Sequence, residues 1–228
     1  MDQDLRRRLD NFKIELCQSA DALRKLLSEL DFGLGDDCWI ADHSPIFGTL
    51  YYRDVLNCIQ FPLAHLPFQA HLDLGLVHLA DPESRRVYSE MNTGDCSWDT
   101  QDELPAAATI VPLICASNNT HLTNFSGDQH AGPLNLTIGD IRNDIRGTPT
   151  QRSWILIGPI RCPQKGAKYT DDEWHSTVRT VLSPVRNVDI TGPGLKSNSA
   201  DGFQRRCHPL LAACLGDYPD HVMIAQVS

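Results

Sequence analysis

The sequence predicts a mixed α/β fold (α+β mixed), because it contains both helix-type and strand-type patterns of apolar residues. Apolar residues recur in steps of four and three over residues 2–31, which is the spacing of one helix face. Thr109–Ser117 and Trp154–Ile160 are continuous apolar, β-branched runs, as expected of buried strands. Asp171–Leu182 gathers its apolar residues on one face, which predicts a second amphipathic helix.

Composition favours a folded intracellular protein. The 228 residues are 41% hydrophobic, which is enough to bury a core, and 21% charged. A net charge of -9 argues against nucleic-acid binding by overall charge, although it leaves room for a local basic strip. No apolar run approaches the roughly 18 residues of a membrane span, and the polar start is unlike a signal peptide. The eight cysteines form no C-x-x-C pair, which suits reduced thiols.

The amino-terminal helix has a heptad-like apolar seam with one polar interruption at Ser19. The seam consists of Leu5, Leu9, Phe12, Leu16, Leu23, Leu26 and Leu30. Gly33 and Gly35 are expected to end the helix. One interpretation is a coiled coil through which the chain self-associates. We favour the other, an amphipathic helix lying on its own domain, since about four heptads is close to the minimum for a coiled coil.

The next segment is predicted to be largely helical. Residues 32–50 resemble a loop, and Tyr51–Gln60 is predicted to form a short helix. Asp81 and Pro82 indicate the start of a helix over about residues 83–91, which would resume near residues 98–103.

Three histidines in this segment are interpreted as surface or loop residues. His65, His71 and His78 are separated by proline and glycine, and their spacing is not that of a compact metal-ligand set such as H-x-x-x-H.

The most regular stretch of the chain is Thr109 to Ile141. After the first strand, Asn118 and Asn119 predict a turn, and Thr120–Ser126 alternates like a half-buried strand. The alternation returns at Leu134, Leu136 and Ile138. Asp140 and Asp144, one helical turn apart, are interpreted as part of a solvated face.

This stretch resembles the core of the Plavaka-type transposases of fungi, in the CACTA class. The matching positions are Ala116, Ser117, Thr120, Leu122, Thr123, Phe125 to Asp128, Ala131, Pro133, Leu136 to Gly139 and Ile141. Further matches in the same order include Ala200 to Phe203 and Asp217 to Pro219, so that the resemblance covers roughly residues 46–228. It implies three parts: an amphipathic helix at 1–32, a helical lead-in at 33–105, and a partial RNase H-like transposase core at 106–228.

The resemblance also implies metal-dependent cleavage and transfer of DNA strands. Such transposases use two Asp and one Glu to hold two Mg²⁺ or Mn²⁺ ions. The position of the first Asp carries Asn118 here, and Asp201 matches the second. The Glu is expected beyond Ser228. Asn118 keeps a carbonyl oxygen but has no charge, so it cannot bridge two metals as a carboxylate does.

The resemblance therefore predicts a truncated, degenerate and inactive copy. No cofactor is expected, and Asp201 would be at most a weak metal ligand. DNA is the partner of the ancestor, and nuclear localisation follows if the ancestral role persists. The alternative is a domesticated, non-catalytic module that self-associates through the amino-terminal seam.

Asp201 has a second interpretation, as a turn or capping acid before Gly202. In either case Leu195–Ala200 is predicted to be a short strand, and Phe203–Leu215 is predicted to be a helix kinked at Pro209.

Overall fold

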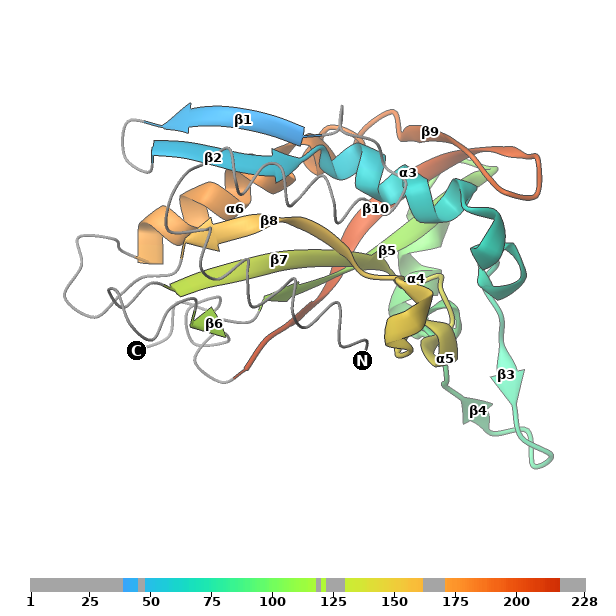
Figure 1. Ribbon diagram of the computed structural model, residues 1–228. Coiled ribbons are helices and arrows are strands. Elements are labelled where there is room, and N and C mark those ends of the chain that lie inside the picture. Colours follow the sequence, from blue (N-terminus) through green and yellow to red (C-terminus); the bar gives the residue numbers. More distant parts are fainter. Residues whose placement is uncertain (1–38, 45–47, 118–119, 122–129, 162–170, 218–228) are drawn as a thin grey trace.

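The computed structural model describes residues 39–44, 48–117, 120–121, 130–161 and 171–217 (Figure 1). The amino-terminal seam, from Leu5 to Leu30, lies outside these residues, as does Asn118.

A six-stranded sheet forms the centre of the described fold. Its strands are β5 (Ala108–Ser117), β6 (Thr120–His121), β7 (His130–Ile138), β8 (Ile155–Arg161), β9 (Leu195–Asn198) and β10 (Gln204–Leu215). β7 lies between β5 and β8 and is antiparallel to both. β10 pairs with the other side of β5 in parallel, and β9 and β10 form an antiparallel hairpin. The chain therefore makes an antiparallel meander and then crosses over to a strand parallel to β5.

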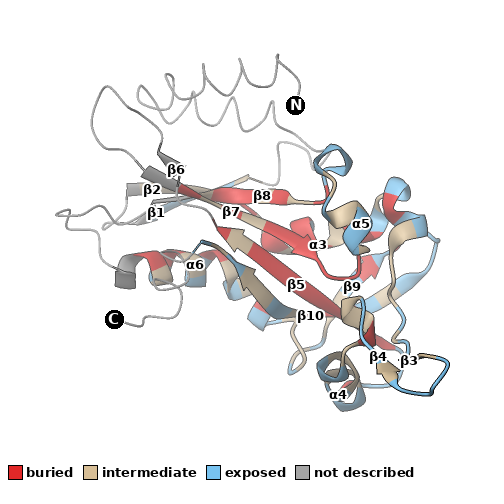
Figure 2. Cartoon of the chain, turned by 90° about the horizontal axis from the view of Figure 1, so that it is seen from below, coloured by how far each residue is buried: buried red, intermediate tan, exposed pale blue. Residues whose placement is uncertain are grey.

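Two helices cover the sheet and complete the core. α3 (Val55–Ala64) begins after Asp54, whose side chain accepts a hydrogen bond from the Leu56 backbone N–H at 2.9 Å and caps the helix. α6 (Asp171–Arg186) makes the crossover between β8 and β9 and contacts α3. β5 is almost wholly buried along its length (Figure 2). One apolar cluster joins α3, α6 and the central strands.

Smaller elements surround this core. β1 (Trp39–Ser44) and β2 (Gly48–Arg53) form an antiparallel pair, and β2 contacts β8. The remaining elements are β3 (Leu79–Ala80), β4 (Arg86–Val87), α4 (Asp95–Glu103), α5 (Asn143–Arg146) and the 3₁₀ turns η2 (Leu66–His71), η3 (Met91–Thr93) and η4 (Pro149–Gln151).

Several predicted elements are confirmed. Thr109–Ser117 and Trp154–Ile160 correspond to β5 and β8, and Leu195–Ala200 contains β9. The alternating leucines and isoleucine of β7 are buried. The helix predicted at Asp171–Leu182 is α6, which has Pro184 inside it and continues to Arg186.

The predicted helix at Phe203–Leu215 is wrong, because this segment is strand β10. The Leu and Ala residues in its second half suit a helix by propensity alone. Pairing with β5 from Arg206 to Leu215 and full burial of Cys207 outweigh this local preference. Pro209, a helix breaker, is accommodated within the strand.

The helical interpretation of the lead-in is also partly wrong. The predicted loop at 32–50 contains β1 and the start of β2, and the predicted helix at Tyr51–Gln60 begins only at Val55. Instead of starting a helix, Asp81 closes a turn by accepting the Arg85 backbone N–H at 2.8 Å, and a 3₁₀ turn and α4 follow later. In this turn the Asp81 side chain accepts the backbone N–H of Arg85, so the carboxylate caps a turn and not the first turn of a helix.

Candidate functional site

The carboxyl ends of β5 and β10 form the first candidate site. Parallel strands end at the same edge of a sheet, where ligands of α/β proteins commonly bind. Ala116 pairs with Leu215 near this edge. Asn118 lies two residues after Ala116 in the chain, and the exposed Asp217 lies two residues after Leu215. Asp217 therefore follows β10 as Asn118 follows β5.

Two thiols lie in the strands that lead to this edge. Cys115 and Cys214 are direct register partners on β5 and β10. Burial, with a smaller contribution from Cys214, raises the pKa of Cys115 to about 12. Burial also raises the pKa of Cys214. Both side chains are thus protonated thiols at neutral pH, a form that is a poor nucleophile and a poor metal ligand.

Asp201 lies at the opposite end of β10. It is in the exposed turn between β9 and β10, and it precedes Arg206, which pairs with the first residue of β5. β10 has 12 residues, which span roughly 40 Å in an extended strand. The structure therefore does not bring Asp201 to the edge at which β5 ends.

The carboxylate of Asp201 is occupied by its own turn. Arg205 donates hydrogen bonds to its two oxygens at 2.8 and 2.7 Å, and the Phe203 backbone N–H donates another at 3.1 Å. These contacts, led by the Arg205 guanidinium, lower the pKa of Asp201 to about 2. Gly202 completes the turn with a φ of 85°. These are the contacts of the turn acid considered in its second interpretation.

A model of the Plavaka transposase family matches residues 47–228, which is most of the chain. The chain belongs to the Plavaka transposase family. No curated protein and no solved structure is significantly similar to it.

A buried acid of this Plavaka family member was missed by sequence reasoning. Asp144 is exposed and paired with Arg142 at 2.8 Å, but Asp140 is only 6% exposed, so its assignment to a solvated face is wrong. Burial, followed by the nearby Asp73, raises the pKa of Asp140 well above its usual range, while Arg146 acts in the opposite direction. Its Oδ2 atom has no hydrogen-bond partner. Asp140 continues the inward alternation of β7, and this signal could have identified it.

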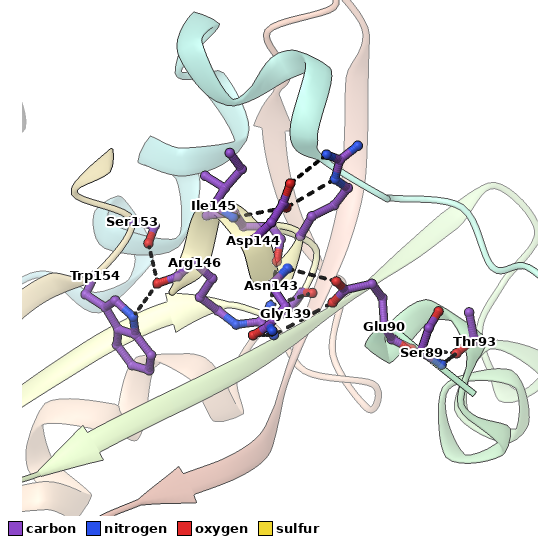
Figure 3. A network of polar contacts seen from close by, with 12 residues as sticks. Ser89, Glu90, Thr93, Gly139, Asn143, Asp144, Ile145, Arg146, Ser153 and Trp154 are labelled. Carbon is purple, nitrogen blue, oxygen red and sulfur yellow. Dashed lines mark hydrogen bonds and ion pairs between the residues drawn. The ribbon is translucent and has the colours of Figure 1, made fainter. Parts of the chain in front are cut away.

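A polar network beside Asp140 has a structural role (Figure 3). The Glu90 carboxylate accepts the Asn143 backbone N–H at 2.8 Å and lies 3.8 Å from the Arg146 guanidinium. The Arg146 carbonyl in turn accepts hydrogen bonds from Ser153 and from the Trp154 indole N–H. The network joins the connection after β7 to the start of β8. Both oxygens of the Glu90 carboxylate have partners within it.

Two of the three lead-in histidines lie against aromatic side chains. His65 stacks on Phe61 with a centroid distance of 4.8 Å, and His78 stacks on Trp98 at 4.0 Å. Among the residues that the structure describes, no group of three or more His, Cys, Asp or Glu side chains could hold a metal ion. No helix in the described part is long and apolar enough to cross a membrane.

Proposed function

We propose that the chain is a transposase-derived protein whose sheet is the early part of an RNase H-like core and which does not cleave DNA strands. Membership of the Plavaka transposase family supports the ancestry. The antiparallel meander of β5, β7 and β8, followed by the α6 crossover to parallel β10, supports the assignment of the core.

The observation that carries the proposal is the shared edge at the carboxyl ends of β5 and β10. Ala116 and Leu215 are the last register partners of these strands, and in the sequence Asn118 comes after β5 and Asp217 comes after β10. We place the second ancestral acid at Asp217 rather than at Asp201. Asp201 is engaged by Arg205 and lies beyond the other end of β10.

Loss of activity follows from the charge at this edge. Two divalent cations a few ångströms apart repel one another, and bridging carboxylates offset that repulsion. Asn118 supplies one neutral oxygen where the family pattern has a carboxylate. Asp217 alone then supplies one negative charge, which is too little for a pair of divalent ions.

The test is to restore the acid. We expect the purified wild-type chain to bind Mn²⁺ weakly and Asn118→Asp to bind it at least about tenfold more tightly, because a carboxylate adds a full charge at close range. The gain is expected to disappear in Asn118→Asp/Asp217→Asn and to persist in Asn118→Asp/Asp201→Asn. Electron paramagnetic resonance of free Mn²⁺ measures each affinity.

Two results would count against the proposal. If Asp201→Asn rather than Asp217→Asn removes the gained affinity, the acid has been placed at the wrong end of β10. If the wild-type chain nicks supercoiled DNA with Mn²⁺, and Asp217→Asn abolishes the nicking, Asn118 does not silence the enzyme.

A second candidate function is self-association, and the heptad-like spacing from Leu5 to Leu30 favours it. If the seam joins two copies, the mass measured by light scattering should halve when Leu16 and Leu23 are changed to Asp. Lys13→Asp/Lys25→Asp is the matched control, because it alters charge off the seam. A monomeric wild-type chain at every concentration would exclude this function.

A further inference from the structure

The β9–β10 hairpin has an outward face of unusual composition for this acidic chain. In an antiparallel pair, residues directly opposite each other share a face, and alternate residues along each strand share it too. Lys196 lies opposite Arg206, and Asn198 lies opposite Gln204. All four are exposed, while Ser197 and Cys207 on the other face are buried. The outward face thus carries two cations and two amides and no carboxylate.

The two cations are uncompensated. Like charges directly across an antiparallel pair destabilise it unless a counter-charge is near. Within the described part of the chain, neither the Lys196 ammonium nor the Arg206 guanidinium has an ion-pair partner. The nearest acid of the hairpin, Asp201, is held by Arg205 in a bidentate pair. Although the whole chain carries a net charge of -9, the outward face of the hairpin is locally positive, because it holds two cations and no acid.

An exposed aromatic ring lies at the tip of the same hairpin. Phe203 is 68% exposed, and the Arg205 guanidinium lies 5.7 Å from its ring centroid. Its backbone N–H is held by Asp201 at 3.1 Å. Covering such an exposed ring with a flat partner removes apolar surface from water, which favours binding.

The hairpin is fixed to the rest of the fold. The Ala200 backbone N–H donates to the Leu63 carbonyl at 2.9 Å, and the Gln60 side chain donates to the Lys196 carbonyl at 2.8 Å. Both partners come from α3, which packs in the core. The cations and the ring are therefore displayed on a rigid support, which lowers the entropy lost on binding.

We propose that this hairpin binds single-stranded nucleic acid, with phosphates on Lys196 and Arg206 and a base stacked on Phe203. Cations spaced along a strand track a phosphate backbone, and an exposed ring stacks on any base. The Gln204 amide donates to the Asn198 Oδ1 atom at 3.3 Å, and the Asn198 Nδ2 group can donate to a phosphate oxygen. A duplex offers phosphates but keeps its bases stacked, so it does not use the ring. The site is at the other end of β10 from Asp217 and needs no metal.

The experiment measures anisotropy of a labelled, mixed-sequence DNA single strand against salt, with the full chain. Each lost phosphate contact lowers the slope of log affinity against log salt by about 0.7, so Lys196→Gln/Arg206→Gln should lower it by about 1.4. Phe203→Ala should weaken single-strand binding about tenfold and leave the slope unchanged. Phe203→Tyr should retain binding. Circular dichroism confirms that each variant is folded.

The matched control removes the same charge elsewhere. Arg85 and Arg179 are exposed residues outside the hairpin, and Arg85→Gln/Arg179→Gln should leave the slope nearly unchanged. Equal loss in the control and hairpin variants would overturn the proposal, because binding would then follow overall charge. Equal loss of duplex and single-strand binding in Phe203→Ala would overturn the stacking role. The same hairpin variants are also tested for binding to phosphatidylserine vesicles. If they lose vesicle binding but keep oligonucleotide binding, the hairpin binds a membrane surface instead.

Discussion

Asp140 should make the stability of the fold decrease as pH rises from acid toward neutral. The residue is 6% exposed, and its Oδ2 atom has no hydrogen-bond partner. Burial raises its pKa well above the ordinary value of 3.8. Above that ordinary value the unfolded chain releases the proton, while the folded chain retains it. The folded state then binds more protons, and the free energy of unfolding must decrease with rising pH.

The size of the effect follows from proton linkage. One retained proton corresponds to about 1.4 kcal/mol of lost stability per pH unit, from about pH 4 up to the pKa of Asp140 in the folded state. Asp73 strengthens the effect, and Arg146 weakens it. Asp140→Asn cannot ionise, so its unfolding free energy should lack this slope. Above about pH 4 the variant should therefore gain stability relative to wild type as the pH rises.

Urea unfolding of both chains at a series of pH values measures the difference. Asp144→Asn is the matched control, since Asp144 is an exposed acid on the same stretch of chain. Relative to wild type, Asp144→Asn should lose a little stability as the pH rises, because the pair with Arg142 lowers the pKa of Asp144 and stabilises its ionised form. Parallel curves for wild type and Asp140→Asn would refute the reasoning and show that Asp140 ionises within the folded protein.

Two further predictions concern packing and thiol chemistry. A Cβ atom on Gly158 would lie 2.7 Å from the Tyr51 carbonyl oxygen, so Gly158→Ala should lower the free energy of unfolding by about 1 to 3 kcal/mol in urea titrations. Gly75→Ala, which meets nothing within 4 Å, should change little. Ellman's reagent at pH 8 should modify exposed Cys96 quickly, and Cys96→Ser should remove that contribution. Cys115, buried and with a pKa of about 12, should react only on unfolding, and fast native labelling of it would contradict its burial.

The central strands were predictable from sequence, because burial on both faces leaves a direct mark on composition. β5 is buried at nearly every position, and its sequence is correspondingly a continuous apolar run. β10 carries no such mark. Its outer residues Leu211 and Leu215 are about half exposed, and its strand conformation depends on pairing with β5, which is distant in sequence.

The wrong helix prediction for β10 also affected the choice of candidate acid. With Phe203–Leu215 interpreted as a helix, no strand was predicted to end near Asp217, and the family resemblance pointed to Asp201. Once the segment is a strand parallel to β5, its carboxyl end is marked by Asp217, within the Asp-Tyr-Pro step that already matched the family pattern. The local signals were present, and what sequence could not supply was the direction in which the chain runs through the sheet.

Overall charge was equally uninformative about local surfaces. A net charge of -9 argues against nucleic-acid binding only if charges act over the whole molecule. At physiological ionic strength they act over about 8 Å. β10 separates the hairpin from Asp217 by roughly 40 Å, so acids at one end do not cancel cations at the other. If the hairpin binds nucleic acid while Asn118 disables the opposite edge, this transposase-derived chain would still bind a nucleic-acid strand although it no longer cleaves one.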